Sequence, residues 1–447
     1  MAPSRALVIG SSVAGLSAAR VLADRFDEVI VVERDAKPEV AEPRKGVPQG
    51  RHVHALLKAG EHALEGLFPG LIAELEKRGG HVFDFANDIR WHHHGVWKKR
   101  YLCGLRVHCQ SRPLVELAMR ERVAANPKIQ FRYQTSVEEL EIKDGRVSSA
   151  LLKDATRARG EKIDLAVDTS GRGSQIDRTL VAAGFKAPFE ERVGIDLQYT
   201  SQMIELAPRA RDFRAVLVYP KPPEDKRGGL IFPIEGGRHM VTLVGWQGDH
   251  PPADLGGFTA FARSLAQPDI ARELVDCKRI GEAAVYKFPY ARRKRFDRMD
   301  RAPQGLFVLG DAFCSFDPVF GQGMSTAAMG AALLQKHLAK DPRGERPLRY
   351  FKALQKILRS PWMLCTSEDF RYPQTTGARP PGITALQRYT SEVFALTAES
   401  PAVYGRFAQV MNLLSGPELL FHPAVLARVL PRLIGLRKAS PPLLEPA

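Results

Sequence analysis

The sequence of 447 residues has little cysteine and no long hydrophobic run. Its five cysteines are odd in number and none stands in a Cys-x-x-Cys pair. This argues against a disulfide framework or a zinc site and predicts reduced thiols in a cytoplasmic protein. No stretch reaches the roughly 20 consecutive apolar residues that a membrane-spanning helix needs. The Gly-x-Ser-x-Gly motif of one hydrolase class is also missing, so that class is not supported.

Basic residues are in excess, with 65 Lys and Arg against 50 Asp and Glu and a net charge of +15. They are scattered and form no dense run with interleaved aromatic residues, so we expect no nucleic-acid partner. A general positive field suits an anionic cofactor, and it would also suit an acidic carrier protein or a membrane surface. The length predicts more than one domain.

A glycine-containing turn near the N-terminus predicts a dinucleotide site. A short apolar strand, Arg5–Ile9, precedes Gly10-Ser11-Ser12-Val13-Ala14-Gly15 and an Ala/Leu-rich helix. A second strand at 29–32 ends in Glu33. In this context Gly10 permits the tight turn, Gly15 lets the helix pack close to the strand, and Glu33 accepts hydrogen bonds from a ribose. Ser12 stands where the dinucleotide-binding pattern has its second glycine. The alternative to a dinucleotide site is an ordinary buried turn between a strand and a helix.

A second motif lies near residue 310. An apolar strand, 306–309, ends in Gly310-Asp311, and Gly321-Gln322-Gly323-Met324 opens a helix at 325–338. The acid at the strand end can hold a ribityl hydroxyl. The free amides at the helix start can stabilise negative charge on a flavin ring.

Together with Val167-Asp168-Thr169-Ser170-Gly171-Arg172-Gly173-Ser174, these motifs resemble the FAD-dependent monooxygenases related to hydroxybenzoate hydroxylase. The closer resemblance is to the flavin epoxidases of polyether-antibiotic pathways, of the lasalocid and monensin type. Segments 44–54, 111–114, 233–238 and 310–324 share in this likeness, which extends to about residue 340. Ser170-Gly171 replaces the Asp-Gly of the aromatic hydroxylases, so their handling of NAD(P)H is not carried over.

The resemblance implies FAD, reduced by NAD(P)H directly or through a separate flavin reductase. It implies that 10–15 and Glu33 bind the ADP half, Arg112 the pyrophosphate or ribityl region, and Asp311 the ribityl chain. Val137 lies beside the adenine, and 318–324 contacts the isoalloxazine. The implied cofactor residues are Gly10, Ser12, Val13, Ala14, Gly15, Glu33, Arg34, Arg44, Arg112, Val137, Asp311, Pro318, Gly321, Gly323 and Met324.

We therefore expect an α/β protein with a Rossmann-type FAD-binding domain, an inserted, mostly antiparallel β substrate domain and a C-terminal helical region. The FAD domain takes 1–50, 105–176 and 295–338, the substrate domain takes 51–104 and 177–294, and the helices take 339–447. Helices are expected at 352–360 and 383–399.

Alternating apolar residues over 190–247 predict a sheet above the flavin, with strands at 194–204, 215–219, 229–233 and 240–246. The expected apolar substrate pocket contains His52, His54, Leu197, Tyr199, Ile231, Pro233 and Phe316. A structural role for the two histidines stays open beside a catalytic one. We predict no catalytic side chain, because the flavin carries the chemistry.

Two further signals are interpreted conservatively. Trp91-His92-His93-His94 is not expected to bind metal, because adjacent residues of a strand point to opposite faces and no carboxylate or cysteine lies at ligand spacing. The segment 423–438 mixes apolar residues with arginines. It suits either a membrane surface or apolar-substrate contact, or else a helix packed on the protein.

The resulting hypothesis is an FAD-dependent monooxygenase of secondary metabolism. It would transfer one oxygen atom from O2, through a flavin C4a-hydroperoxide, to an apolar substrate by epoxidation or hydroxylation. The alternatives are a flavin-dependent reductase of prenyl double bonds, a flavin halogenase, or a flavin-binding protein without catalytic activity.

Overall fold

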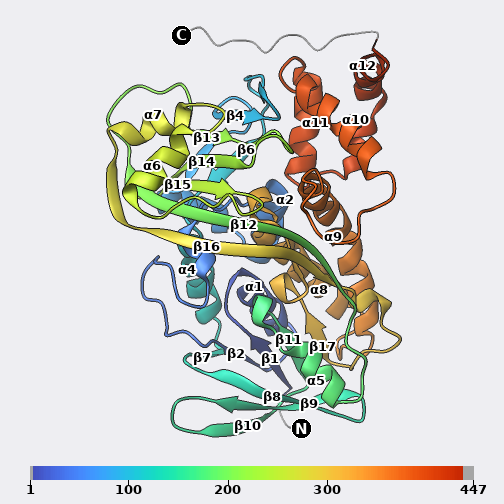
Figure 1. Ribbon diagram of the computed structural model, residues 1–447. Coiled ribbons are helices and arrows are strands. Elements are labelled where there is room, and N and C mark those ends of the chain that lie inside the picture. The colour runs from blue at the N-terminus through green and yellow to red at the C-terminus, as the bar shows by residue number, and fades with distance from the viewer. Residues whose placement is uncertain (1–3, 436–447) are drawn as a thin grey trace.

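The computed structural model describes residues 4–435. Figure 1 shows a parallel sheet in the lower half of the molecule and a larger sheet above it. The parallel sheet has the strand order β17-β11-β1-β2-β7. Except for the edge strand β7, its strands are short, mostly apolar runs buried on both faces, as is typical of parallel sheets. They are β1 (Arg5–Ile9), β2 (Glu28–Val32), β7 (Ile129–Arg132), β11 (Leu165–Asp168) and β17 (Leu306–Val308).

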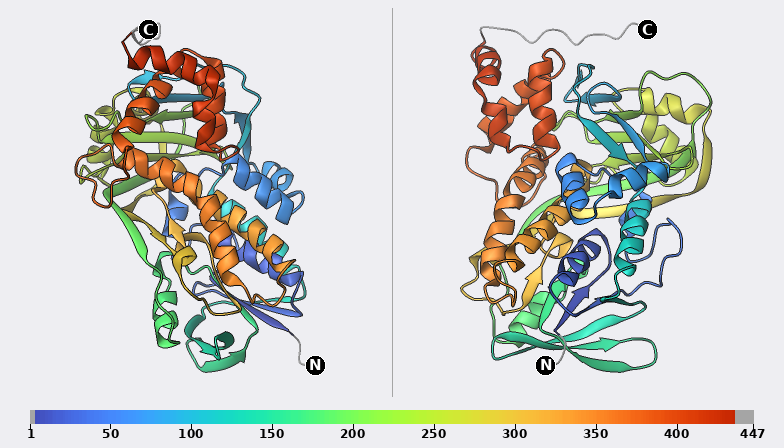
Figure 2. Two further views of the ribbon diagram at one scale, coloured as in Figure 1. Left: turned by 90° about the vertical axis from the view of Figure 1, so that its right-hand side faces the viewer. Right: turned by 180° about the vertical axis from the view of Figure 1, so that it is seen from behind.

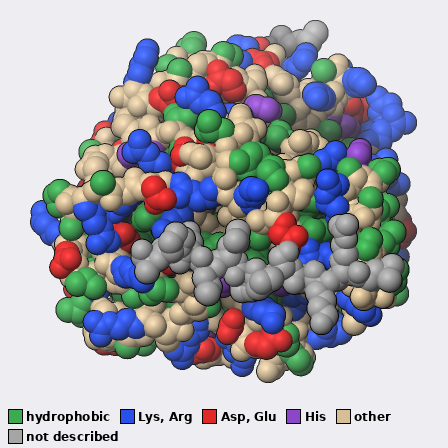
Figure 3. Space-filling view, turned by 90° about the horizontal axis from the view of Figure 1, so that it is seen from above, with side chains coloured by type: hydrophobic (Ala, Val, Ile, Leu, Met, Phe, Trp, Pro, Cys, Tyr) green, Lys and Arg blue, Asp and Glu red, His purple; other side chains and the backbone are tan. Residues whose placement is uncertain are grey.

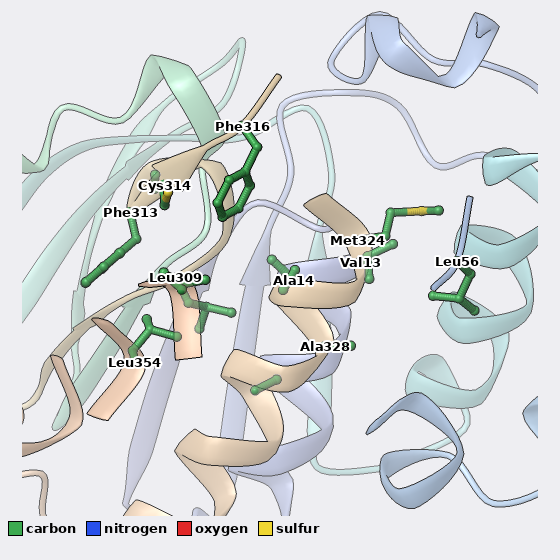
Figure 4. Packing of buried hydrophobic residues seen from close by; sticks show 14 of the residues in the cluster. Val13, Ala14, Leu56, Leu309, Phe313, Cys314, Phe316, Met324, Ala328 and Leu354 are labelled. Carbon is green, nitrogen blue, oxygen red and sulfur yellow. The ribbon is translucent and has the colours of Figure 1, made fainter. Parts of the chain in front are cut away.

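Helices and a small antiparallel sheet cover the parallel sheet. Helices α1 (Val13–Ala23) and α8 (Gln322–Leu338) lie side by side and bury small residues such as Ala18 and Ala328 between them, which allows a close approach. Figure 4 shows Val13 and Met324 together at the starts of these two helices. The other covering elements are α4 (Arg112–Ala124), α5 (Ile176–Ala182), β8 (Ser136–Lys143), β9 (Arg146–Lys153) and β10 (Ala158–Lys162).

The larger sheet has the order β18-β16-β12-β15-β14-β13-β4-β5, and its pairs are antiparallel except β13 with β4. The expected strands of 194–246 are present. The long strand β16 was not predicted; with β12 it spans the two halves of the molecule (Figure 1). The strands are β4 (Ile89–His93), β5 (Val96–Trp97), β12 (Glu190–Glu205), β13 (Ala215–Val218), β14 (Arg227–Ile234), β15 (Arg238–Gly245), β16 (Lys278–Lys294) and β18 (Cys314–Ser315).

The two faces of this sheet belong to different hydrophobic clusters. Ile231 packs with Val216 and Val241 under helices α6 (Leu255–Arg263) and α7 (Asp269–Val275), away from the parallel sheet. Leu197, Tyr199 and Leu230 belong to the main cluster on the other face. The expected inner position of Ile231 is therefore wrong. Because side chains alternate along a strand, a shift of one residue exchanges the faces, and Phe232 packs against the main cluster instead.

The remaining helices complete the structure. Helices α2 (Lys58–Leu67) and α3 (Leu71–Lys77) lie against the FAD domain, with α2 packed on α8, and β3 (His81–Asp84) pairs with β6 (Arg106–Cys109). The C-terminal region contains α9 (Pro347–Asp369), α10 (Ile383–Leu396), α11 (Pro401–Met411) and α12 (Pro423–Leu433). Figure 2 shows α9 running from beside the parallel sheet toward the upper helices. The expected helix at 352–360 is thus much longer.

Helix α12 packs on α10 through Val425 and Val429, and Arg432 pairs with Glu392 and Glu399 at 3.0 and 3.1 Å. Arg437 and Lys438 of the predicted basic tail lie outside the described residues. Within 4–435, no helix has both the length and the apolar character needed to cross a bilayer. Figure 3 shows Lys and Arg side chains scattered over the face seen from above rather than gathered in one patch.

Candidate flavin site

A cavity of about 510 Å³ lies between the two sheets. Its walls are the first glycine turn, the ends of β2 and β11, the segment 44–55, the start of β8, and the loop 310–324, with β12 and β16 above. The cavity lies at the carboxyl ends of parallel strands, where open α/β sheets bind ligands. Of the predicted cofactor residues, all but Gly15 line it.

The glycine turn has the geometry that the sequence predicted. Gly10 has φ +95°, a conformation that a residue with a side chain rarely adopts. Gly15 lies behind the turn, where an added Cβ would stand 1.9 Å from the Gly10 carbonyl oxygen. Its role is therefore to let α1 pack closely, as predicted. Ser12 has ordinary extended backbone angles, so it is tolerated where the pattern asks for glycine.

Glu33 is buried within a network of charges at one end of the cavity. Its carboxylate accepts hydrogen bonds from Ser11 Oγ at 2.6 Å and from Arg44 Nη1 at 2.7 Å. Burial opposes ionisation of Glu33, but Arg44, Ser11 and the Asp35 amide outweigh it, and the pKa of the carboxyl is lowered. Arg44 also binds Asp35 and Glu116. Glu33 Oε1 accepts only the Asp35 amide within residues 4–435, so it retains acceptor capacity for a ribose hydroxyl.

Arg112 and Asp311 face the middle of the cavity. Arg112 donates to Glu116 at 2.9 Å and approaches His54 Nε2 at 3.5 Å. Burial raises the pKa of Asp311, and the guanidinium groups of Arg112, Arg172 and Arg292 oppose that rise. An acid held among cations is suited to a hydrogen bond with a ribityl hydroxyl, as the sequence predicted for Asp311.

The loop 318–324 crosses the cavity before α8. Gly321 has φ +64°, and an added Cβ there would meet the Ala55 Cβ at 2.9 Å. Gly323 has open space where a Cβ would stand, and α8 begins without a side-chain cap. Figure 4 shows Met324 on the first turn of this helix. The amides at this helix start are thus free for an acceptor on a planar ring.

His52 and His54 are buried and neutral. Burial, with the charge of Arg51, lowers the pKa of His52 to about 4, and burial with Arg112 lowers that of His54 to about 3. His52 Nδ1 lies 2.7 Å from Ser201 Oγ, and His54 Nδ1 donates to the His52 carbonyl at 2.9 Å. The first bond fastens His52 to the larger sheet and the second holds the segment 52–54 together, which favours the structural role over proton donation.

Aromatic residues form the wall beneath the larger sheet. Tyr199 and Phe316 line the cavity as expected, whereas Leu197, Ile231 and Pro233 do not. Leu197 is buried in the main cluster, and the alternation that turns Ile231 outward applies equally to Pro233, two residues on. Tyr286 and Phe288 of β16 and Arg172 also line the cavity and were missed. The alternation Tyr286-x-Phe288-x-Tyr290 was the available signal for a strand there.

The histidine run forms a separate cluster. His93, His94 and Glu368 of α9 have ligand atoms within 4.8 Å of one another, which the spacing argument did not foresee because Glu368 is distant in sequence and His94 has φ +53°. Glu368 already accepts Arg371 at 2.8 Å and His94 at 2.9 Å. Arg371 already compensates the charge of this carboxylate, which favours an ion-pair cluster over a metal centre.

The residues present fit FAD. The cavity offers a glycine turn at a helix start, a buried carboxylate with a free acceptor position, guanidinium groups in the middle, and a second uncapped helix start beside aromatic side chains. The glycine turn would receive the pyrophosphate and the carboxylate a ribose, the guanidinium groups would face the pyrophosphate or ribityl region, and the second helix start would receive the isoalloxazine.

Comparisons with known proteins agree with this geometry. Residues 4–355 match the family model described as FAD binding domain. The chain is 30% identical over 397 residues to Protein Rv3254 of Mycobacterium tuberculosis, covering 83% of this chain and 81% of that protein. It is 26% identical over 366 residues to kynurenine 3-monooxygenase of Salinispora tropica, covering 79% and 76%. The structure of p-nitrophenol 4-monooxygenase PnpA from Pseudomonas putida has the same fold, with a TM-score of 0.65, 15% identity and coverage of 93% and 99%.

Proposed function

Because the chain belongs to the FAD binding domain family, we propose that it is an FAD-dependent monooxygenase that transfers one oxygen atom from O2 to a largely apolar organic substrate. The observation that carries this proposal is the division of the cavity. One end has the charged groups that an adenosine diphosphate needs. The other end, below β12 and β16, is lined by the aromatic residues Tyr199, Tyr286, Phe288 and Phe316. A kynurenine 3-monooxygenase among the relatives supports the reaction class.

Each part of the site has a task in this reaction. FAD, once reduced, supplies the two electrons with which O2 is activated. The free amides at the start of α8 stabilise negative charge on the ring. The aromatic wall orients the substrate and excludes water. Burial lowers the pKa of His52 and His54, so at neutral pH neither carries an imidazolium proton that it could give up in the reaction. Oxygen transfer to an alkene does not require a side chain of the protein to act on the substrate as an acid or a base.

We propose an alkene of polyketide or terpenoid type, converted to an epoxide, as the substrate class; hydroxylation of an aromatic ring is the near alternative. The apolar wall and the resemblance of segments 44–54 and 310–324 to polyether-pathway epoxidases support it. The flavin would be reduced by NAD(P)H or by a separate reductase. Reduction measured without oxygen, with NADH, with NADPH, and with an added flavin reductase, separates these donors.

Isotopically labelled O2 tests the oxygen-transfer proposal. Purified protein with FAD, a reductant and a panel of apolar alkenes and phenols should yield a product that carries one labelled oxygen atom. Turnover should stop without O2. A reductase of prenyl double bonds would instead yield a saturated product without O2. A flavin-binding protein without catalytic activity would consume reductant at a rate that no substrate raises. Either result would reject the proposal.

A further inference from the structure

Two buried carboxyl groups meet at the wall of the cavity. Asp317 precedes the loop 318–324 and is fully buried, and Asp369, at the end of α9, is 1% exposed. The two side chains lie within hydrogen-bonding reach of each other. Asp369 lies beyond residues 4–355, the part of the chain that matches the family model, so it comes from outside the family's common core.

The charge around this pair is not compensated. Within residues 4–435, no Lys, Arg or His makes a salt bridge with either carboxyl; the groups that face the pair are Tyr199, Tyr219, Trp246, Cys365, Glu368 and Tyr372. Glu368 is occupied by Arg371 and His94. Two ionised carboxylates in contact without a cation would be strongly destabilising, so one of them holds a proton.

The unpaired oxygen atoms point to the same conclusion. Asp317 Oδ2 and Asp369 Oδ2 are both buried without a conventional donor. Asp317 Oδ1 accepts the Val319 amide at 2.8 Å. An acidic proton on Asp369 gives Asp317 a donor in addition to the Val319 amide and the Trp246 indole N–H. Burial raises the pKa of Asp317 to about 6, and burial together with the charge of Asp317 raises the pKa of Asp369 well above its usual value. The proton therefore stays on Asp369 when Asp317 ionises.

Asp317 in turn holds the loop. Its carboxylate caps the single turn Pro318–Phe320, and the Tyr219 hydroxyl donates to the Val319 carbonyl at 3.0 Å from the other side. Asp317, Pro318 and Gly321 all line the cavity. A change in the protonation of Asp369 thus reaches the cavity wall through one hydrogen bond and one turn.

We propose that Asp369 is a positioning residue of the flavin site: as a neutral carboxylic acid it donates a hydrogen bond to Asp317 and so fixes the turn Pro318–Phe320 against the cofactor. The C-terminal helical region is thereby connected to the loop that binds the ring. The inference rests on FAD occupying the cavity and on nothing about the substrate.

The test compares Asp369→Asn with Asp369→Leu. Asparagine keeps a donor for Asp317 and has no carboxyl proton to lose, whereas leucine removes the donor at position 369 and leaves only the Val319 amide and Trp246. FAD affinity of Asp369→Asn should stay within about threefold of the parent protein at neutral pH. It should not weaken at alkaline pH, where the parent loses the Asp369 proton. Asp369→Leu should bind FAD roughly tenfold to a hundredfold more weakly, as expected for a lost hydrogen bond to a charged group.

Infrared spectroscopy gives a readout that does not depend on activity. The band of a protonated buried carboxyl should be present in the FAD-loaded parent at neutral pH and absent from Asp369→Asn. The matched control is Asp341→Asn. Asp341 is also buried, but it accepts the amides of Glu345 and Arg346 away from the cavity, so that variant should retain the band and the pH profile.

Two results would overturn the proposal. One is the absence of any difference in the carboxyl band between the parent and Asp369→Asn. The other is an FAD affinity of Asp369→Asn as low as that of Asp369→Leu. Neither measurement involves oxygen transfer, so failure here and failure of the monooxygenase proposal are distinguishable.

Discussion

The two ends of the cavity bury their carboxyl groups in opposite ways. At the end formed by β1 and β2, Glu33 is ionised and held by Arg44, and Asp311 in the middle faces three guanidinium groups. At the loop end, Asp317 and Asp369 meet each other, and within residues 4–435 neither makes a salt bridge with a cation. The first arrangement prepares fixed charge for a polar, anionic ligand. The second keeps net charge low beside the aromatic wall where an apolar molecule would bind.

The largest effect on stability is expected from removing Arg44, the cation at the end of the cavity formed by β1 and β2. Arg44→Met removes the cation that Glu33, Asp35 and Glu116 share, and it leaves carboxylates buried without compensation. Loss of one partner of a buried pair costs about 3–5 kcal/mol. We expect a loss of this size in the free energy of unfolding, measured by denaturant titration at saturating FAD.

An exposed pair is the matched control. Arg20 and Asp24 are 2.6 Å apart on α1, with side chains 33% and 40% exposed. Arg20→Met should cost about 0–1 kcal/mol. Equal losses for Arg44→Met and Arg20→Met would show that the Glu33 network contributes no more than a surface ion pair.

The next effect concerns the cofactor. Asp311→Ala removes the acceptor predicted for the ribityl chain, and a hydrogen bond to a charged group is worth about 1.5–3 kcal/mol, or a tenfold to hundredfold change in affinity. FAD and FMN should be weakened alike, because both have the ribityl chain. Glu33→Gln should weaken FAD far more than FMN, since FMN lacks the adenosine. Titration of both flavins with both variants checks the order of groups along the cavity; equal losses of FAD and FMN in Glu33→Gln would reject the ribose assignment.

Ionisation of Asp317, at the loop end of the cavity, should lower the free energy of unfolding as pH rises. The pKa of Asp317 is about 6 in the folded protein and near 3.8 in the unfolded chain, so the folded state binds more protons between these values. Its contribution to stability is complete below pH 3.8 and is lost as pH rises through about 6. The free energy of unfolding of Asp317→Asn, minus that of the parent, should therefore rise over this window by about 1–3 kcal/mol. A difference that is flat or falls with pH would show that Asp317 is not held in a raised-pKa environment.

Much of the charged end could be predicted from the sequence, because glycine turns and strand-end acids are local signals. Gly10, Gly15 and Glu33 take their geometry from residues close to them in the chain, and the structure places them as expected. Arg120, which donates to Ser11 Oγ at 2.8 Å and was not predicted, reaches the turn from a helix more than 100 residues away. No local pattern indicates such a contact.

The other end depends on register and on distant packing. Ile231 and Phe232 are neighbours, and only pairing with β13 and β15 decides which of them faces the main cluster. Asp369 and Glu368 follow each other at the end of α9, yet one meets a second acid and the other meets His94 and Arg371. Sequence identified the helix region but not which of its side chains would meet Asp317, because that is set by where α9 packs on the rest of the protein.

The smallest effect on FAD affinity is expected for Tyr286→Phe, which tests whether Tyr286 contacts the isoalloxazine ring or the substrate. Tyr286 lies opposite Tyr199 on neighbouring strands, and its hydroxyl accepts a hydrogen bond from Gln49 Nε2 at the limiting distance of 3.5 Å. A contact this long is worth at most about 0.5 kcal/mol, so Tyr286→Phe should change FAD affinity by no more than about threefold. If the aromatic wall receives the substrate, the same variant should shift KM for the substrate while kcat at saturation stays close to that of the parent, since the removed hydroxyl would touch only bound substrate. A tenfold loss of FAD affinity would instead place the isoalloxazine against Tyr286, and the substrate region would then have to lie further along the face formed by Phe232 and Met240. The assignments at the charged end would be unaffected by that revision.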